Sequence, residues 1–500
     1  MDLQDRQRII AQQVKLKETS DIEIKGLKQP LYNYQKLGVE FLTASGGRAI
    51  LADSPGVGKS AQTLAYLVHN KIAKTLIVCP ASVKYAWENE VNKWTNLKAL
   101  VIDGQFASKS IKTYFNQISE TNIFIINYDL LKKFVPILKD VSFDCLVLDE
   151  FHLIKNIRAQ RTKLVKLIAG RINRLIMLSG TPMLNRPEEL YNALNLLDPK
   201  TWNNWLKYIL RYCGAYRGRW GWDTSGATNV GELREKISPY FLRRTKSDVL
   251  KELPPKNFIT VPVALEAEHE SIYRHAEKNL SSYLRDYKQK SNSEIRRSLA
   301  AEKLVKLNAL RQITTTGKVA SAEELIDQLI ENQEKVIVFS VYNEPLEYLK
   351  NRYGVKSVML TGKTALEERG RIISDFQNNR NVQIFLGGTK AAGVGITLTA
   401  ASNVIFIDYE WVPALMEQAA DRAHRIGQEA ESVNIYQIYA KNTIDDYMEK
   451  LLEGKRALVD QLIEGKEPEE QEVSTVEIIC IKLLLKNLNL TLTIIITPKK

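Results

Sequence analysis

The sequence predicts an α/β protein made of two tandem lobes, each built on a parallel sheet. Short β-branched and aliphatic runs alternate with helix-patterned segments, which is typical of parallel α/β folds. A charged, helix-favouring stretch with few strand signals, Ser247–Gln333, separates two groups of such runs. Each group must bury its own sheet, so we expect two cores. The expected strands are Thr75–Cys79, Ile123–Ile126, Cys145–Leu148 and Leu175–Leu178 in the first lobe, and Lys335–Phe339, Val382–Leu386 and Asn403–Ile407 in the second.

These runs and the segments between them predict four parts of the chain. Residues 1–28 are a polar N-terminal segment, and 29–250 are the first lobe with a helical insert near 187–240. Residues 251–465 are the second lobe with a helical insert near 265–330, and 466–500 are a charged linker and an apolar tail to which we assign no function. The Pro254-Pro255 pair is a candidate hinge between the lobes, because proline fixes φ and blocks helix continuation.

One segment of the first insert, Trp202–Trp222, is crowded with aromatic residues and arginines. Such a mixture can stack on nucleic acid. However, Trp202, Trp205, Tyr208 and Tyr212 follow helical spacing, which favours ordinary packing inside the insert.

The composition indicates a globular protein with a polyanionic partner. The 500 residues carry a formal charge of +12, and binding to phosphates releases counterions whatever the sequence of the nucleic acid. A basic but otherwise unremarkable soluble protein is the alternative reading. The four cysteines form no CxxC pair, and the N-terminus lacks the apolar core of a secretory signal. No clean apolar span reaches membrane length, so we expect the reducing cytoplasm and no membrane partner.

A phosphate-binding loop is indicated at 51–60, where an apolar run is followed by Asp53-Ser54-Pro55-Gly56-Val57-Gly58-Lys59-Ser60 and then a helical pattern. The glycines let backbone N–H groups approach phosphate oxygens, Lys59 supplies a point charge, and the Ser60 hydroxyl can bind Mg²⁺. We expect Asp53 and Gly56–Ser60 to bind the nucleotide, although Asp53 stands where this loop usually has its first glycine.

Two adjacent carboxylates follow the apolar strand Cys145–Leu148. Open α/β sheets place ligand-binding groups at such strand ends. We expect Asp149 to hold Mg²⁺ with Ser60, and Glu150 to polarise the water that attacks the terminal phosphate. The alternative is a surface Asp-Glu pair without a catalytic role.

A third candidate group lies at Gln418–Gln428. If this segment is helical, Gln418, Arg422 and Arg425 share one face, because they are four and three residues apart. Two guanidiniums would then face the charge that develops in phosphoryl transfer. The alternative is a helix surface with an Asp421–Arg425 ion pair.

From about Leu31 to Leu452 the chain resembles the Swi/Snf-type ATP-dependent DNA translocases of helicase superfamily two. The sequences of Arg243–Leu250 and Leu253–Lys256 are similar to those of the annealing-helicase branch. The resemblance rests on an ordered series of motifs: Leu31-Tyr32-Asn33-Tyr34-Gln35, the phosphate loop, Val78-Cys79-Pro80-Ala81-Ser82, Asp149-Glu150-Phe151-His152, Leu178-Ser179-Gly180-Thr181-Pro182, Phe241-Leu242-Arg243-Arg244 and His424-Arg425-Ile426-Gly427-Gln428.

The resemblance implies two RecA-like lobes with ATP and Mg²⁺ in the cleft between them, and an arginine finger from the second lobe. It implies that Gln35 recognises adenine, that Gly395 and Gln418 lie near the nucleotide, and that His152 and Thr181 couple nucleotide state to the lobes. It further implies a set of residues that contact the DNA backbone: Pro80, Ala81, Ser82, Asn127, Tyr128, Thr389, Lys390 and Gly393.

The chain departs from the family pattern at two places. Ser54-Pro55 replaces the acidic and apolar residues that usually follow Asp53, and Phe151 replaces a small residue before His152. All groups needed for hydrolysis remain: Lys59, Ser60, Asp149, Glu150, Arg422 and Arg425.

We therefore expect a monomeric motor that moves on duplex or forked DNA and uses ATP to remodel or reanneal it or to displace bound proteins. One alternative is a motor that acts on RNA or on an RNA polymerase complex, because related lobes serve several substrates. Another is a nucleic-acid-binding scaffold that has kept the fold without catalysis.

Overall fold

The computed structural model describes residues 3–103, 120–138, 141–218, 221–250, 252–289, 293–392 and 396–464. The described residues divide into two compact units, which are 3–253 with 458–464 (unit 1) and 254–457 (unit 2). The division falls at the Pro254-Pro255 pair. The apolar tail and Cys480 lie outside the described residues.

Unit 1 is built on a seven-stranded sheet in the order β3-β4-β2-β5-β6-β1-β9, in which every neighbouring pair is parallel. Its central strands are buried throughout, which explains why they read as continuous apolar runs instead of alternating ones. The strands are β1 (Arg48–Leu51), β2 (Thr75–Cys79), β3 (Ala99–Val101), β4 (Ile123–Asn127), β5 (Cys145–Asp149), β6 (Arg174–Leu178) and β9 (Phe241–Leu242).

The helices of unit 1 connect these strands and cover the sheet. They are α1 (Leu3–Lys15), α2 (Asn33–Ala44), α3 (Lys59–His69), α4 (Lys84–Trp94), α6 (Leu131–Leu138), α7 (Gln160–Ala169), α8 (Tyr191–Leu197), α9 (Trp205–Tyr212), α10 (Val230–Ile237) and α11 (Lys246–Val249).

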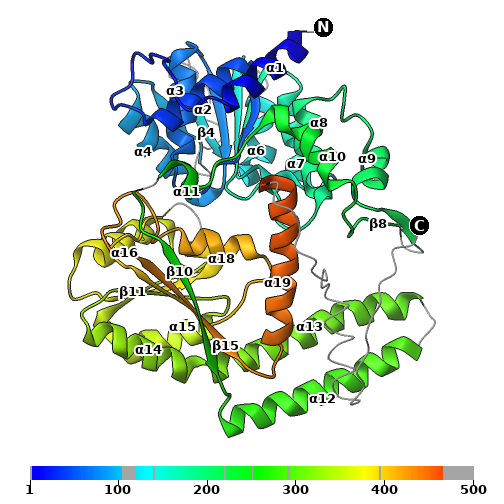
Figure 1. Ribbon diagram of the computed structural model, residues 1–500, viewed down its shortest axis with the longest axis vertical. Coiled ribbons are helices and arrows are strands. Elements are labelled where there is room, and N and C mark those ends of the chain that lie inside the picture. The colour runs from blue at the N-terminus through cyan, green and yellow to red at the C-terminus, as the bar shows by residue number, and fades with distance from the viewer. Residues whose placement is uncertain are drawn as a thin grey trace. The chain divides into compact units, whose positions relative to one another are not determined.

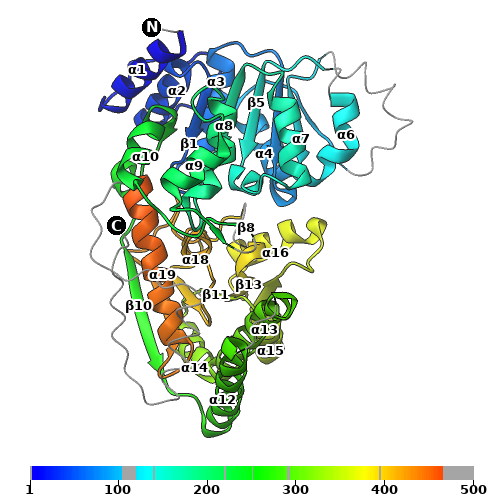
Figure 2. The same cartoon turned by 90° about the vertical axis from the view of Figure 1, so that its right-hand side faces the viewer.

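The N-terminal segment is part of unit 1, contrary to the expectation of a separate polar segment. Helix α1 packs against α2 (Figure 2), and Ala11 and Val14 are buried. On its other side, Arg8 Nη2 lies 2.7 Å from the Asp198 carboxylate. Ala11 and Val14 are three residues apart and share the buried side of this helix, so a segment that is polar in composition still packs on unit 1.

The insert near 187–240 is not wholly helical, because it includes an antiparallel hairpin of β7 (Tyr216–Gly218) and β8 (Gly221–Asp223). Trp202, Tyr208 and Tyr212 are buried in the core of unit 1. The packing interpretation of these aromatic residues is confirmed.

Unit 2 contains a six-stranded parallel sheet in the order β10-β15-β14-β11-β13-β12. Apolar clusters cover both of its faces. The strands are β10 (Lys256–Val263), β11 (Val336–Ser340), β12 (Ser357–Leu360), β13 (Ile384–Gly388), β14 (Asn403–Phe406) and β15 (Val433–Ala440). The helices are α12 (Ala267–Gln289), α13 (Ser293–Gly317), α14 (Val319–Glu331), α15 (Asn343–Tyr353), α16 (Leu366–Asn378), α17 (Thr389–Ala392), α18 (Pro413–Ala420) and α19 (Asp445–Val459).

The fold class of two tandem parallel α/β lobes is confirmed, and each of the seven expected strands is present to within about two residues at either end. Strand β10 was missed, because it lies inside the stretch expected to be helical and contains Pro262. A proline is tolerated there because β10 is an edge strand, beside β15 in Figure 1.

The end of the described chain also corrects the expected extent of the second lobe. Residues 458–464 belong to unit 1, where Leu462 and Ile463 are buried in its core next to α10. The helical pattern of α19 gives no sign of this change of unit. Among the described residues, every helix is too short or too polar to cross a membrane.

Candidate active site

The parallel topology of unit 1 brings five motif segments to the same edge of its sheet. Each follows the carboxyl end of a strand: the phosphate loop follows β1, Pro80 follows β2, Asp149 ends β5, Ser179 follows β6 and Arg243 follows β9. Carboxyl ends of parallel strands form the ligand-binding edge of open α/β sheets. The candidate site is therefore assembled from segments that are up to about two hundred residues apart in the sequence.

The phosphate loop has the backbone that its glycines predict. Gly56 and Gly58 both have φ of +88°, a conformation that glycine adopts without strain. Gly58 immediately precedes α3, so the N–H groups at the start of this helix are directed toward the loop. A Cβ at Gly58 would also lie 2.4 Å from Gln35 Nε2, so a side chain there would displace the Gln35 amide.

The Lys59 ammonium group lies among backbone carbonyls and carboxylates of the loop. Its Nζ donates to Asp53 O at 2.6 Å and to Ser54 O at 3.2 Å. Loss of solvent lowers the pKa of Lys59, an effect opposed first by the charge of Glu150 and then by Asp53 and Asp149. Lys59 is thus held next to the carboxylates with which the sequence grouped it.

Gln35 lies against the phosphate loop, close to where the resemblance places it. Its Nε2 donates to Val57 O at 3.2 Å, and its Oε1 accepts from Tyr32 N at 3.0 Å. Tyr34 adds a bond from its hydroxyl to the same Val57 carbonyl at 3.0 Å. The start of α2 is therefore fastened to the loop beside the candidate nucleotide position.

Asp53 is not a ligand-facing group, which corrects its assignment to cofactor binding. Its side chain has no exposed surface, and its carboxylate accepts from Arg244 Nε at 3.1 Å and from Gln62 Nε2 at 3.2 Å. The residue supports the loop from inside the protein.

Asp149 is held by an indole that the motif comparison did not single out. Trp87 Nε1 donates to Asp149 Oδ2 at 2.8 Å. Burial and the adjacent charge of Glu150 raise the pKa of Asp149, and a bound divalent cation would offset both effects. Ser60 and Asp149 are the oxygen donors that Mg²⁺ prefers, so this residue set suits the ion.

Replacing Trp87 with phenylalanine is expected to raise the Mg²⁺ concentration needed for half-maximal ATP hydrolysis about tenfold, because groups that orient a metal ligand contribute on that scale. A Mg²⁺ titration of ATPase activity measures it. Trp94→Phe is the matched control, because Trp94 lies on the same helix and its Nε1 bonds Glu90 Oε2 at 2.9 Å. Equal Mg²⁺ dependence in the two variants would contradict the role of Trp87.

Glu150 is linked directly to the coupling motif that follows β6. Ser179 Oγ donates to Glu150 Oε2 at 2.8 Å, and His152 Nδ1 lies 3.2 Å from the same oxygen. Thr181 joins through its backbone N–H, which donates to Ser179 Oγ at 3.1 Å. Burial raises the pKa of Glu150, but His152, Lys59 and Ser179 together hold it below its usual value. The structure thus brings together the catalytic and coupling residues of unit 1.

Ser179→Ala is expected to move the acid limb of the kcat profile to higher pH. The Glu150 carboxylate must be ionised to accept a proton. Because its pKa lies below the usual value, it stays ionised until the pH falls through this lowered pKa. Removing one donor raises the pKa of Glu150, so activity is lost earlier on acidification. Ser45→Ala, which removes another buried serine hydroxyl of unit 1, should leave the limb in place. An unshifted limb in Ser179→Ala would argue against the link.

The two departures from the family pattern are accommodated by packing. Pro55 fills the space that Gly180 leaves, since a Cβ at Gly180 would lie 2.6 Å from Pro55 Cγ. Phe151 is 1% exposed and belongs to the core of unit 1. These residues change what the site packs against without displacing Lys59, Asp149 or Glu150.

The expected DNA contacts of unit 1 separate into two kinds. Ala81 and Ser82 are exposed and Pro80 is half-buried, so this segment is accessible to a nucleic acid. Asn127 and Tyr128 are only 6% and 3% exposed, and the Tyr128 hydroxyl donates to Asp149 O at 2.8 Å. The Tyr128 side chain therefore supports Asp149 from the interior and is not available to contact DNA, whereas the expectation that this segment meets the DNA backbone stays a prediction.

The arginine segment of unit 2 is not one continuous helix, contrary to the expectation. Helix α18 ends at Ala420, so Gln418 is helical and buried while Arg422 and Arg425 lie in the turns beyond it. Arg422 is 3% exposed and donates to Ile396 O. Arg425 is half-buried, and its Nη1 donates to Thr397 Oγ1 at 3.2 Å.

The alternative interpretation of this segment also changes. Asp421, which could have paired with Arg425, forms an ion pair with Lys256 at 2.7 Å. His424 Nε2 lies 2.8 Å from Pro254 O. These contacts join the arginine segment to Pro254 and Lys256, near the start of unit 2, and the same segment carries Arg425.

Thr389 and Lys390 form the start of α17, at the end of β13. Thr389 is buried and Lys390 is exposed, so of these two side chains the charged one, Lys390, is accessible. Gly393 and Gly395 lie outside the described residues.

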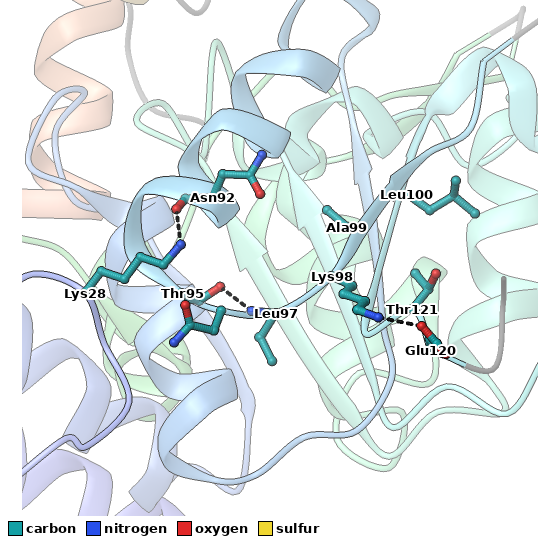
Figure 3. Close-up of a pocket in the computed structure, with 10 residues that line it drawn as sticks. Lys28, Asn92, Thr95, Leu97, Lys98, Ala99, Leu100, Glu120 and Thr121 are labelled. Carbon is teal, nitrogen blue, oxygen red and sulfur yellow. Dashed lines mark hydrogen bonds and ion pairs between the residues drawn. The ribbon is translucent and has the colours of Figure 1, made fainter.

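A hollow of about 540 Å³ in unit 1 is lined by a different set of residues (Figure 3). Its two lysines are engaged within the hollow, since Lys28 Nζ donates to Asn92 O at 2.8 Å and Lys98 pairs with Glu120 at 2.5 Å. No candidate site residue lines it, and we assign it no part in the chemistry.

Sequence reasoning missed Trp87, Gln62 and the roles of Ser179, Arg243 and Arg244. Ser179, Arg243 and Arg244 lie inside motifs on which the resemblance rests, so the motif sequences already carry a signal for them. Trp87 and Gln62 carry no local signal, because only the fold places them beside Asp149 and Asp53.

The family of the chain is shown by comparison with known domains. The model of the SNF2-related domain matches residues 34–319, and that of the helicase conserved C-terminal domain matches residues 317–427. The chain belongs to the SNF2-related family. The resemblance deduced from the motifs is confirmed, and with it the assignment of the two units as RecA-like lobes of a helicase-type protein.

Several curated relatives of this SNF2-related chain have informative names. It is 33% identical over 453 residues to the SWI/SNF-related matrix-associated actin-dependent regulator of chromatin subfamily A-like protein 1 homolog of Caenorhabditis elegans, covering 87% of this chain and 62% of that protein. It is 30% identical over 468 residues to the DNA annealing helicase and endonuclease ZRANB3 of Homo sapiens, covering 89% and 41%. An uncharacterized ATP-dependent helicase of Mycoplasma pneumoniae is 31% identical over 450 residues, covering 87% and 42%.

Among solved structures, the Sulfolobus solfataricus SWI2/SNF2 ATPase core in complex with dsDNA matches with 27% identity and a TM-score of 0.43, covering 89% of this chain and 95% of that one. This SNF2-related chain spans between 41% and 62% of the three curated relatives named above.

Proposed function

We propose that this chain is a DNA-stimulated ATP hydrolase that uses hydrolysis to move along DNA. The observation that carries the proposal is the arrangement at one sheet edge of unit 1, where Lys59, Asp149 and Glu150 lie within one network of charges and hydrogen bonds. Such a network in a member of the SNF2-related family supports phosphoryl transfer more directly than fold does.

In this proposal the residues of unit 1 bind and orient the triphosphate. The backbone of Gly56–Gly58 and the start of α3 receive the phosphates, and Lys59 neutralises part of their charge. Ser60 and Asp149 would hold Mg²⁺, which supplies charge neutralisation at the phosphate oxygens when bound. Gln35, whose Nε2 donates to Val57 O, would contact the adenine beside the loop.

Glu150 is the general base in this proposal. Its carboxylate is kept ionised by Ser179, His152 and Lys59, so it can polarise a water molecule for in-line attack. Ser179 also bonds the Thr181 backbone, so a change at the terminal phosphate reaches the coupling motif through one hydroxyl. This connection suits a motor, in which chemistry must alter the protein.

Unit 2 contributes Arg425 to the same nucleotide in the closed state of the motor. A planar guanidinium that is always ionised stabilises the charge that develops on the transferring phosphoryl group. Closure would be favoured by ATP and released by hydrolysis, because only the closed state adds these contacts. Alternating grip on the sugar-phosphate backbone would then move the chain along one strand.

Several observations favour DNA as the substrate. Ala81, Ser82 and Lys390 are accessible, and the net charge of +12 suits a polyanion. The names of two relatives include DNA annealing helicase activity or a regulator of chromatin. Rewinding or remodelling of duplex or forked DNA is the finer proposal, and these names support it.

The test is ATP hydrolysis measured with duplex DNA, single-stranded DNA, forks and RNA, with Lys59→Ala as the inactive reference. We expect stimulation by duplex or forked DNA that weakens as salt is raised, because backbone contacts release counterions. Stimulation by RNA alone would favour the RNA motor. Binding of DNA without hydrolysis in any condition would favour the scaffold.

A further inference from the structure

The segment by which the chain leaves unit 1 runs beside the phosphate loop. Strand β9 pairs in parallel with β1, with Phe241 opposite Ile50 and Leu242 opposite Leu51. Both strands therefore end at the same edge of the sheet, β1 in the loop and β9 in the exit segment. The pairing continues past both strands, since Ala52 N donates to Leu242 O at 2.7 Å and Ser54 N donates to Arg244 O at 3.0 Å.

Arg244, in this exit segment, binds the inner side of the phosphate loop. Its Nε donates to Asp53 Oδ1 at 3.1 Å, its Nη2 forms an ion pair with Asp53 Oδ2 at 2.5 Å, and Nη2 also donates to Gln62 Oε1 at 2.8 Å. Its Nη1 donates to Tyr34 O, and the guanidinium lies 5.6 Å from the Tyr34 ring centroid. One side chain thus joins the exit segment to the loop, to α3 and to the start of α2.

The preceding Arg243 makes a second connection. Its Nη1 donates to Ala52 O at 2.6 Å and to Gly180 O at 2.9 Å. It therefore joins the root of the phosphate loop to the coupling motif after β6. The two consecutive arginines together contact the phosphate loop, α2, α3 and the segment after β6.

The charge of Asp53 makes the Arg244 contact more than incidental packing. A carboxylate without exposed surface is costly unless it is paired, and a forked guanidinium pairs with both of its oxygens. The surroundings are fitted closely around the pair, because a Cβ at Gly38 would lie 1.8 Å from Gln62 Oε1 and 3.2 Å from Arg244 Nη2. A shift of the phosphate loop would therefore displace Arg244, and a shift of Arg244 would displace the loop.

The stretch of chain after Arg244 is short and leads directly to unit 2. Thr245 and Asp248 form a capping box on α11, and the first part of unit 1 ends at Leu253. The exit segment is thus held to the phosphate loop at its start and lies shortly before the division between the units in the sequence.

We propose that Arg244, assisted by Arg243, is a positioning residue that couples nucleotide binding at the phosphate loop to the exit segment 244–250. The inference rests on the proposed nucleotide site and adds the route by which its state reaches the linker. Arg244 touches loop residues and not the nucleotide, so it acts through Asp53 and Tyr34.

The test compares Arg244→Gln with the double variant Asp53→Asn/Arg244→Gln. The single variant leaves Asp53 buried and unpaired, and its thermal stability should drop. The double variant removes both charges and should recover stability. If Arg244 couples the sites, the double variant still binds fluorescently labelled ADP about tenfold more weakly than wild type, a typical coupling factor. Arg244→Lys, which keeps the charge without the fork, should bind ADP with intermediate affinity.

The decisive readout is hydrogen exchange of the 244–250 amides with and without saturating ADP. We expect ADP to slow exchange there in the wild type and not in Asp53→Asn/Arg244→Gln or in Arg244→Lys. Arg211→Gln is the matched control, because Arg211 makes a forked contact with Glu232 elsewhere in unit 1, and it should keep the wild-type response.

A purely structural role for Arg244 predicts that ADP affinity returns with stability in the double variant, and that result would overturn the inference. So would a wild type whose 244–250 amides do not respond to ADP. These measurements use no DNA, so a chain that binds ADP with the expected response but is not stimulated by DNA would sink only the proposed motor function. A wild type that binds no nucleotide would overturn both.

Discussion

Glu150→Gln is expected to lower the kcat of ATP hydrolysis by about two to four orders of magnitude while the nucleotide still binds. Glutamine keeps the shape of the side chain and can still accept from Ser179, whose hydroxyl lies 2.8 Å from Glu150 Oε2. It cannot take a proton from water. The loss should therefore appear in turnover at saturating DNA and ATP, measured by phosphate release, and not in the dissociation constant of labelled ADP.

Two variants frame this result. Glu235→Gln, on the exposed face of α10, should leave turnover unchanged and controls for the removal of a negative charge from unit 1. Lys59→Ala should abolish turnover and also weaken nucleotide binding, because the ammonium group that faces the phosphates is gone. Undiminished hydrolysis in Glu150→Gln would refute the assignment of the general base.

Arg425→Ala is expected to reduce turnover by about three orders of magnitude, the scale on which arginine fingers contribute. The residue is half-buried at the end of a turn, held by Thr397 Oγ1 at 3.2 Å and by the Asp421 carbonyl at 3.2 Å. These contacts orient the guanidinium without enclosing it. Nucleotide should still bind unit 1, so ADP affinity in the absence of DNA should change little.

Arg422 provides the internal comparison for this experiment. It is 3% exposed, and its side chain donates from Nη1 to Ile396 O at 3.4 Å. Arg422→Ala should therefore lower the melting temperature as well as activity, whereas Arg425→Ala should lower activity alone. Arg352→Ala, on an exposed turn of α15, should change neither. Full turnover in Arg425→Ala would mean that Arg425 is not the arginine finger.

Much of the candidate site could be predicted from short stretches of the sequence. The glycines at 56 and 58, the lysine after them and the paired carboxylates after a buried strand each carry their chemistry in adjacent residues. Gly56 and Gly58 do adopt the left-handed backbone that the loop requires. The failures have a common physical origin. Asp53 was expected at the nucleotide and Tyr128 at DNA, but the first is neutralised by a residue 191 positions later and the second bonds the carbonyl of Asp149.

The arginine segment shows the same limit in a different way. Its spacing suits a helix, yet α18 stops at Ala420, and the chain turns so that Asp421 meets Lys256 and His424 meets Pro254. Helical spacing is a weak guide where tertiary contacts compete for the same residues.

The order of motifs along the chain was enough to predict the parallel α/β class and the SNF2-related family, which are confirmed, and to propose the residues that carry phosphoryl-transfer chemistry, because each of these depends on neighbouring residues. Contacts between distant segments settled which of those residues face a ligand and which hold others in place. Parallel strands bring their carboxyl ends to one edge whatever their separation in sequence, so Trp87 reaches Asp149 and Arg244 reaches Asp53 only once the sheet has formed.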